Sequence, residues 1–388
     1  MKKVCVITGS RAEYGILRPL IDRLRNDEDI ELQVIATGMH LSPEFGLTYR
    51  QIEQDGYKIN EKIETLLSSD TTVGISKSIG LGLISFSEAY QRLKPDLIII
   101  LGDRYEIFAA ASAAMVFKIP IAHLHGGELT EGAIDEAIRH AITKMSYLHF
   151  TSTEVYRQRV IQLGEAPERV YNVGALGVEN IKKMKLLTQY TLEEQLQFKF
   201  DKKIALITFH PVTLENKTSQ EQFEVLLKAI DSFKDLKIIF TKANADTDGR
   251  IINDMIDEYV NRHEDRCIAF TSMGQERYLS ALKYSSIVIG NSSSGIIEAP
   301  SFNIPTVNIG DRQKGRIKSS SVIDCKVDSV QIKQAIEYGL TKYDQNPQVE
   351  NSNPYEKDNT SDQIIKYIKI FFKQSASTLK KKFYDLEQ

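Results

Sequence analysis

Short apolar runs that each end in a polar cluster recur along this chain, and they constrain its fold more than any other feature. In the stretch from Pro95 to His140, the apolar run Leu97–Leu101 stops at the motif GDR at 102–104. A helical stretch follows, and the next apolar run, 119–123, stops at the motif HGGE at 125–128. Such runs are typical of parallel strands covered on both faces, and their alternation with helices predicts an α/β fold with a doubly wound parallel sheet.

The polar residues after these two runs are candidates for an active site, because open α/β sheets bind ligands at the carboxyl ends of their strands. Each residue alone is equally compatible with a solvated surface position. Gathered beside glycines that let the backbone approach a ligand, they favour an active site. The candidates are Asp103, Arg104, Glu106, His123, His125, Glu128, Glu131, Asp135, Arg139 and His140.

The same alternation runs through the chain twice. It pauses in a lysine-rich stretch at about 177–191, which we interpret as a linker, and then restarts. A length of 388 residues also exceeds what one core usually supports. The polar clusters GSR, TGMH, GDR, HLHGGE, FHP, KANAD, GNSSSG and GDRQKGR all follow apolar runs and are shared between the halves. We therefore expect two domains whose carboxyl edges face a common cleft.

Composition excludes several classes of protein. The balance of 49 basic and 52 acidic residues argues against a partner that is a nucleic acid or a membrane surface. No run of 18 apolar residues is present, and the apolar run after Met1 is too short for a signal peptide. The three cysteines are far apart, which predicts reduced thiols and a cytoplasmic location. His123 and His125 lack a third ligand at a recognisable spacing, so we expect no metal.

Several segments suit a phosphate or a diphosphate. The turn at 9–15 places Arg11 at the start of a helix, the sequence GNSSSGIIE places hydroxyls and Glu298 at another, and 312–316 is a basic loop. The alternatives are an ordinary βα turn, a serine-rich helix cap and a solvated loop. His210 either protonates a leaving phosphate or caps a strand end. The carboxylates of the first half suit general acid–base chemistry on a sugar, so the residues indicate a nucleotide diphosphate joined to a reacting sugar.

The chain resembles the hydrolysing UDP-N-acetylglucosamine 2-epimerases, the NeuC-type enzymes that open bacterial sialic acid synthesis. The matching segments are GSRAEYGI (9–16), TGMHLS (37–42), GDRYEIF (102–108), HLHGGELTEGAIDEAIRHAITKMS (123–146), FHPVT (209–213), NADT (244–247), GNSSSGIIEAPS (290–301), GDRQKGR (310–316) and SSVIDC (320–325). The resemblance implies a GT-B-like fold of two Rossmann-like domains, with residues 1–176 as the first and 177–361 as the second. It also implies that the last segment, 362–388, packs back on the first domain, and that the chain forms a homodimer or homotetramer through that domain.

The implied reaction converts UDP-N-acetylglucosamine and water to N-acetylmannosamine and UDP. UDP leaves by anti elimination to 2-acetamidoglucal, which water then hydrates, and neither nicotinamide nor metal is needed. Asp103 and Asp135 match the family's catalytic carboxylates, and His210 matches the histidine at the diphosphate. The residues that match UDP-contacting positions are Arg11, Ala12, Arg104, Asn244, Asp246, Ser292, Ser293, Glu298 and Arg312. Many relatives have glutamate where this chain has His125, so either His125 or Glu128 takes over that proton transfer.

Three other functions remain open at this point. The same chemistry on UDP-2,4-diacetamido-2,4,6-trideoxyglucose would feed legionaminic acid synthesis. A GT-B glycosyltransferase would share the nucleotide site but leave C2 of the sugar untouched. A sugar-nucleotide sensor would bind UDP without releasing any.

Overall fold

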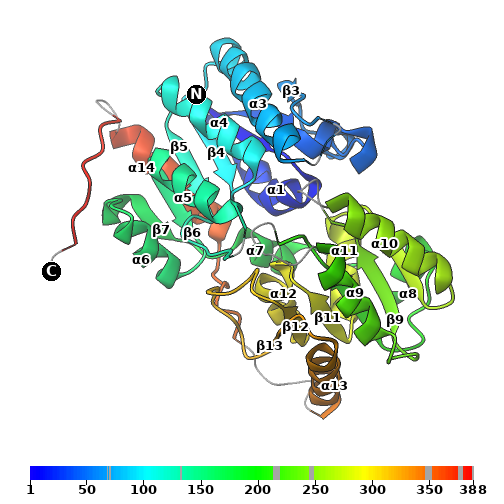
Figure 1. Cartoon of the computed structure of the whole chain (residues 1–388). Helices are drawn as coiled ribbons and strands as arrows, with labels where there is room; N and C mark the ends of the chain where they lie inside the picture. The colour runs from blue at the N-terminus through cyan, green and yellow to red at the C-terminus, as the bar shows by residue number, and fades with distance from the viewer. Residues whose placement is uncertain are drawn as a thin grey trace. The chain divides into compact units, whose positions relative to one another are not determined.

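The computed structural model describes residues 1–67, 69, 71–131, 133–212, 219–243, 249–345, 352–374 and 379–386 (Figure 1). The chain divides into two compact units. Unit 1 comprises Met1–Glu128, Asp135–Asn180 and Tyr355–Gln388, and unit 2 comprises Leu129–Ile134 and Ile181–Pro354. Within the described ranges, no helix has the length and apolar character needed to cross a membrane.

Unit 1 is built on a seven-stranded sheet in the order β3-β2-β1-β4-β5-β6-β7, with every pair parallel. Its strands are β1 (Lys2–Thr8), β2 (Ile30–Thr37), β3 (Glu61–Ile63), β4 (Leu97–Leu101), β5 (Ile121–Leu124), β6 (Leu148–Thr151) and β7 (Val170–Asn172). Its helices are α1 (Arg11–Arg25), α2 (Tyr49–Gln54), α3 (Thr72–Leu93), α4 (Tyr105–Val116), α5 (Asp135–Met145), α6 (Glu154–Gln162) and α14 (Thr360–Gln374), with 3₁₀ turns η1 (Gly38–Leu41), η2 (Pro43–Phe45) and η3 (Pro167–Arg169). Strand order reverses between β1 and β4, which makes their carboxyl ends the switch point where such sheets bind ligands.

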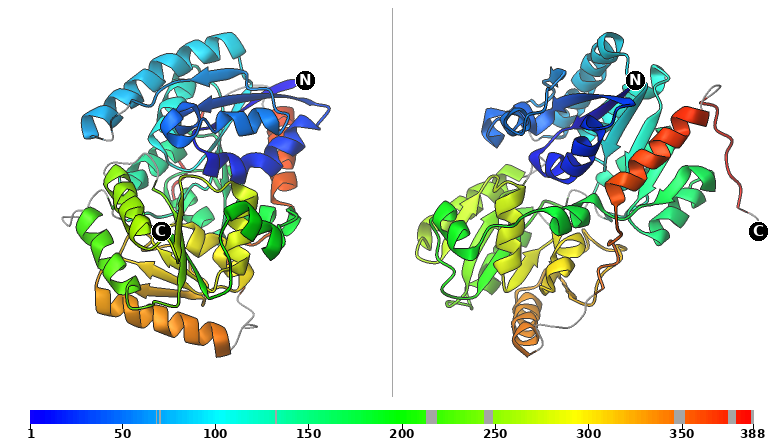
Figure 2. Two further views of the ribbon diagram at one scale, coloured as in Figure 1. Left: turned by 90° about the vertical axis from the view of Figure 1, so that its right-hand side faces the viewer. Right: turned by 180° about the vertical axis from the view of Figure 1, so that it is seen from behind.

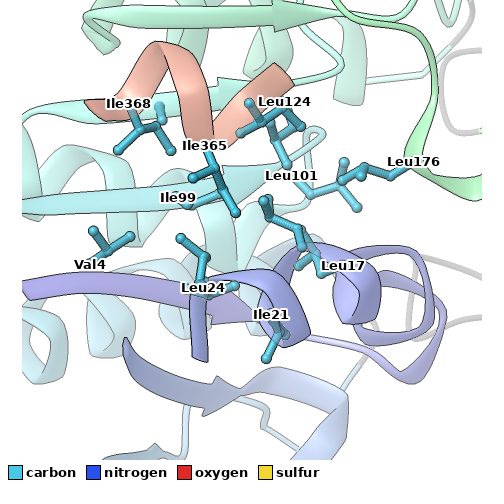
Figure 3. Packing of buried hydrophobic residues seen from close by; sticks show 14 of the residues in the cluster. Val4, Leu17, Ile21, Leu24, Ile99, Leu101, Leu124, Leu176, Ile365 and Ile368 are labelled. Atoms are coloured by element: carbon cyan, nitrogen blue, oxygen red, sulfur yellow. The ribbon is translucent and has the colours of Figure 1, made fainter. Parts of the chain in front are cut away.

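Alternate residues of the central strands feed two separate cores. Val4 and Ile99 point to the face covered by α1 and α14, where they meet Leu17 and Ile368 (Figure 3). The other face is covered by α3 and α4, and the right-hand view of Figure 2 shows α1 and α14 together on the opposite side. Each such side chain, fully buried, contributes about 1.5–3 kcal/mol. Burial on both faces explains why the strands read as unbroken apolar runs.

Helix α3 contains three glycines, which are unfavourable inside a helix, and one of them is needed for packing. A Cβ at Gly82 would lie 2.9 Å from the Cβ of Ala109 in α4, so glycine here allows the two helices to approach closely. Gly80, in contrast, faces open space. The alanine-rich sequence of α4 contributes the other small surface of this contact.

Unit 2 has a six-stranded sheet in the order β10-β9-β8-β11-β12-β13, again with every pair parallel. Its strands are β8 (Ile204–Thr208), β9 (Lys237–Thr241), β10 (Cys267–Phe270), β11 (Ile287–Gly290), β12 (Thr306–Ile309) and β13 (Val322–Cys325). Its helices are α8 (Gln189–Leu196), α9 (Ser219–Ile230), α10 (Gly249–Arg262), α11 (Gln275–Tyr284), α12 (Ser294–Ile297) and α13 (Ser329–Gln345), with the 3₁₀ turn η4 (Ala299–Phe302). The strand order reverses between β8 and β11. Two doubly wound parallel sheets confirm the predicted fold class.

The stretch read as a linker is helical. Helix α7 (Leu176–Lys183) begins inside unit 1, where the Glu179 carboxylate accepts hydrogen bonds from the backbone N–H and the hydroxyl of Ser361, at 2.9 and 3.0 Å. The Asn180 amide donates to the carbonyl of Gly15 at 2.8 Å. These buried polar contacts join α7 to the start of α14 and to α1.

A buried carboxylate at the amino edge of the first sheet holds the C-terminal segment. Glu165 is 1% exposed, and its oxygens lie 2.6 Å from Lys144 Nζ, 2.9 Å from Lys381 Nζ and 3.1 Å from His149 Nε2. Burial alone would raise the pKa of Glu165, but the hydrogen bonds from His149 and Lys144 lower it to about 2. The cluster is a compensated ionic network with a structural role.

Candidate active site

The turn after β1 positions the first candidate residues of unit 1. Ser10 is the N-cap of α1 and Glu13 completes a capping box, so the sequence GSRAE starts the helix at Arg11. Arg11 and Ala12 therefore lie in the first turn of α1, next to the carboxyl end of β4, where Arg104 precedes α4. The predicted UDP-contacting residues of unit 1 thus share the switch point of its sheet.

Asp103 forms an ion pair with the buried guanidinium of Arg139. Arg139 comes from α5 and is 2% exposed, and it also donates to the backbone carbonyl of Glu128 at 2.8 Å. The Arg139 guanidinium therefore contacts the residues that follow both β4 and β5 and holds these two strand ends together. The sequence named Arg139 as a candidate but gave no sign of this pairing.

His125 and Glu128 form a hydrogen-bonded pair after β5. His125 Nδ1 lies 2.8 Å from Glu128 Oε1, and the Ser152 hydroxyl donates to the same oxygen at 2.7 Å. The Glu128 side chain is 3% exposed and that of His125 is 13% exposed. Within the described part of the chain, His125 Nε2 is buried with no hydrogen-bond partner. His125 also has φ +63°, a left-handed backbone conformation that is uncommon for histidine.

His123, a candidate for the active site, is a buried core histidine. Its Nε2 lies 2.8 Å from the carbonyl of Gly102 and its Nδ1 3.2 Å from the hydroxyl of Thr143. Burial lowers the pKa of His123 to about 3, so the ring is neutral at physiological pH. In the described ranges, no group of three or more His, Cys, Asp or Glu side chains is arranged to hold a metal ion.

Asp135 begins α5, and the segment before it belongs to unit 2. In Leu129–Ile134, the carbonyl of Leu129 accepts a hydrogen bond from Arg316 Nε at 2.8 Å. Glu131 lies 3.3 Å from Lys314 Nζ. Two cations of the loop predicted to clamp a diphosphate therefore contact this segment. Glu128 and Asp135, the residues that flank the segment, both belong to unit 1.

In unit 2, His210 and Asn291 lock together the carboxyl ends of β8 and β11. The His210 backbone N–H donates to Asn291 Oδ1 at 2.7 Å, and the Asn291 amide donates to the His210 carbonyl at 2.8 Å. Arg312 Nη1 and Gln313 Nε2 donate to the Asn291 carbonyl at 3.1 and 2.8 Å. Sequence reasoning missed the roles of Asn291 and Gln313, because neither residue type carries a distinctive signal at these positions.

Ser292, Ser293 and Glu298 lie around α12, which is only four residues long. So short a helix has little macrodipole, and the binding of UDP by these residues stays a prediction. The Ser294 hydroxyl donates to the Glu298 carboxylate and accepts from the Tyr278 hydroxyl at 2.6 Å. The predicted UDP-binding residues Asn244 and Asp246 lie outside the described residues.

Comparisons with known proteins agree with this arrangement. A family model described as UDP-N-acetylglucosamine 2-epimerase matches residues 22–369. The chain is 47% identical to a Campylobacter jejuni protein named GDP/UDP-N,N'-diacetylbacillosamine 2-epimerase (hydrolyzing), over 85% of each chain. It is 41% identical to the polysialic acid biosynthesis protein P7 of Escherichia coli, over 100% of this chain and 98% of that protein.

A solved structure supports the fold at lower sequence identity. The structure of UDP-GlcNAc 2-epimerase from Neisseria meningitidis bound to UDP-GlcNAc matches with a TM-score of 0.75 and 18% identity, over 95% of this chain and 100% of that one. This likeness shows a GT-B-like fold of two parallel-sheet units. The match to the family model and the relatives at 47% and 41% identity establish that the chain belongs to the UDP-N-acetylglucosamine 2-epimerase family.

Proposed function

We propose that this chain is a hydrolysing 2-epimerase, which converts a UDP-linked 2-acetamido sugar and water to UDP and the free sugar inverted at C2. The observation that carries the proposal is the set of proton-transfer groups at neighbouring strand ends of unit 1. Asp103 follows β4, His125 and Glu128 follow β5, and Asp135 opens α5. Elimination and hydration each need a proton removed and a proton delivered, which such a set can supply.

The sugar that we propose is 2,4-diacetamido-2,4,6-trideoxyglucose, carried on UDP. The 47% identical relative is named for N,N'-diacetylbacillosamine, which is this sugar. UDP-N-acetylglucosamine is the second candidate, favoured by the family description and by the relative named for polysialic acid biosynthesis. The products would enter legionaminic acid or sialic acid synthesis, respectively.

The proposed reaction has two stages. A base removes the proton at C2 while the C1–O bond breaks, so that the electron pair forms the C1–C2 double bond and UDP leaves. Water then bonds to C1 and loses a proton to a base, while an acid delivers a proton to C2 on the face opposite to the one that lost its proton. We assign these proton transfers to Asp103, Asp135 and His125, and the protonation of the departing phosphate to His210.

We assign the proton transfer at the 125–128 motif to His125 instead of Glu128. The Glu128 carboxylate is buried and already accepts from the Ser152 hydroxyl while it contacts His125 Nδ1. It therefore orients the imidazole ring, as a carboxylate orients histidine in a catalytic triad. Nε2 of His125, which has no hydrogen-bond partner in the described structure, is then the atom to which we assign the proton transfer.

We further propose that each unit carries residues that bind UDP. In unit 1, Arg11, Ala12 and Arg104 would contact the diphosphate. In unit 2, His210 and Arg312 would do so. Ser292, Ser293 and Glu298 would contact the rest of the UDP, as would Asn244 and Asp246. Support comes from the solved relative bound to UDP-GlcNAc, whose fold matches over both units.

We also propose a homodimer, or a homotetramer built from such dimers, in the cytoplasm. Large apolar side chains are exposed together on α3 and at the end of α4, including Ile84 at 62% and Val116 at 68%. A second copy would cover this surface. The free thiols of Cys5, Cys267 and Cys325 suit a reducing compartment.

The test is to compare turnover of UDP-2,4-diacetamido-2,4,6-trideoxyglucose, its GDP-linked form and UDP-N-acetylglucosamine, and to identify the free sugar. We expect kcat/KM to be highest for the UDP-linked diacetamido sugar, by about tenfold or more. A higher value for UDP-N-acetylglucosamine would make the second candidate the substrate. Release of no free sugar from any of the three would refute the proposed function.

A further inference from the structure

The ends of β1, β2 and β4 converge on the carboxylate of Glu106. This residue is 1% exposed. A Cβ at Gly9, after β1, would lie 2.4 Å from Glu106 Oε1, and a Cβ at Gly38, after β2, would lie 3.0 Å from it. Glycine at both positions therefore makes room for this carboxylate. The packing is specific, since a buried charge costs free energy unless it has partners.

Arg104 is the partner that the structure gives to Glu106. Its Nε donates to Glu106 Oε1 at 2.7 Å, and the Arg104 side chain is 12% exposed. Arg104 is the extended N-cap residue of α4 and Glu106 lies in the first turn of that helix. The hydrogen bond therefore spans two residues and fixes the direction of the guanidinium at the switch point.

A second buried carboxyl group lies beside this pair. Glu13 Oε2 accepts hydrogen bonds from the backbone N–H groups of Gly9 and Ser10, at 2.7 and 3.2 Å. Burial and then the charge of Glu106 raise the pKa of Glu13 to about 7, although Arg104 and the two backbone bonds oppose the rise. Burial and the neighbouring carboxylate therefore favour the protonated form of Glu13.

Apart from the Asp103–Arg139 ion pair, whose charges cancel, the groups that bear on the charge at these strand ends are Arg11 and His40. Arg11 carries a positive charge at the start of α1. Burial lowers the pKa of His40 to about 3, so His40 is neutral, with its ring nitrogens 3.0 Å from the Thr8 hydroxyl and 2.8 Å from the Thr48 hydroxyl. With Glu13 protonated, two guanidinium groups and one carboxylate leave a net positive charge, which favours an anion.

We propose that Glu106 is a positioning residue, which aims the Arg104 guanidinium at the substrate diphosphate. The inference rests on the proposed function, because it needs Arg104 to contact that diphosphate. Glu106 would not touch the substrate and would act mainly through its hydrogen bond to Arg104. Ionisation of Glu13 would add a negative charge beside the bound anion and weaken binding.

The first test is the Glu106→Gln variant, measured as KM and kcat for the sugar nucleotide. We expect KM to rise about tenfold with kcat changed less than threefold, because a bond to a charged group orients the guanidinium. In the Arg104→Gln background, Glu106→Gln should raise KM no further. The matched control is Glu61→Gln, which removes the Glu61–Arg92 pair on the edge strand β3, with Nε to Oε1 at 2.8 Å, and should leave both constants unchanged.

An unchanged KM in Glu106→Gln, or an effect that adds in full to that of Arg104→Gln, would overturn the inference. If Glu106→Gln fails to fold, Glu106→Asp replaces it, since the shorter carboxylate should also raise KM. In the wild type, KM should rise as pH increases through about 7, and Glu13→Gln should flatten that rise. Calorimetric affinity for UDP reads out the Arg104–Glu106 coupling even if no sugar nucleotide is turned over, so the two proposals can fail separately.

Discussion

Unit 1 buries carboxylates at the amino ends of its strands (the amino edge) and at their carboxyl ends (the carboxyl edge). The pKa values of the two carboxyl groups are shifted in opposite directions. At the amino edge, Glu165 contacts Lys144, Lys381 and His149, and its pKa falls to about 2. At the carboxyl edge, Glu13 lies beside a second carboxylate, and its pKa rises to about 7. The charge of Glu165 is compensated by groups of the protein itself. Glu13 instead lies beside a carboxylate of like charge, and Arg104 compensates the two only in part. Such mismatches of charge cluster at functional sites, where a ligand changes the balance.

The largest effect that we expect comes from the carboxyl edge. Asp103→Asn should lower turnover about 100-fold or more while UDP affinity stays within about threefold, because the amide cannot transfer a proton. The assay is steady-state kinetics with calorimetric UDP binding. The matched control is Asp96→Asn at the opposite end of β4, where Asp96 accepts from the Lys3 N–H at 2.8 Å. If both variants keep full turnover, Asp103 is only structural.

Glu165→Gln should break the amino-edge cluster and lower the free energy of unfolding by about 3 kcal/mol at pH 7, because it removes a buried carboxylate whose pKa the cluster lowers to about 2. A carboxylate with a depressed pKa stabilises the fold above its unfolded pKa near 4.5, and this contribution is lost as pH falls toward 2. The loss should therefore shrink between pH 5 and pH 3, as measured by urea unfolding. Turnover per folded molecule should not change. An equal loss at pH 7 and pH 3 would contradict this explanation.

Glu13→Gln should raise the free energy of unfolding, whereas Glu165→Gln lowers it. The raised pKa of Glu13 means that wild-type stability falls as pH rises from about 4.5 to about 7, since the folded state holds the proton longer. The glutamine variant should therefore be about 2 kcal/mol more stable than the wild type at pH 8 and equal to it at pH 4. Urea unfolding at both values is sufficient. A variant that is less stable at pH 8 would show that the two bonds from Gly9 and Ser10 outweigh the charge.

The smallest effect should come from Lys381→Met, at about 1 kcal/mol of unfolding free energy. Lys144 and His149 still contact Glu165 after this change, and the Lys381 side chain is 21% exposed. Hydrogen exchange of the Tyr384 amide, which donates to the Gly164 carbonyl at 3.0 Å, reports release of the C-terminal segment. Unchanged exchange would mean that Lys381 does not hold this segment.

The sequence predicted Leu97–Leu101, a strand buried on both faces, with the bounds that the structure has. It missed two edge strands, one in each sheet. The edge strand β3 (Glu61–Ile63) carries two charged residues, and β13 (Val322–Cys325) is only partly buried. Neither therefore produces an apolar run.

For the candidate site, the sequence predicted which residues follow the strands but not their pairings. Asp103, His125 and His210 are placed by strand ends, which periodicity reveals. The contacts of Arg139 with Asp103, of Ser152 with Glu128 and of Asn291 with His210 join residues far apart in sequence. Such contacts depend on the order of strands in the sheet, which the local pattern does not contain.

The most direct test of the account is isotope incorporation during turnover of the UDP-linked 2-acetamido sugar. The proposed elimination and hydration predict deuterium at C2 of the free sugar in heavy water and solvent oxygen at C1, with C2 inverted. A free sugar that keeps its original hydrogen at C2 would contradict the account, because neither stage could then have occurred.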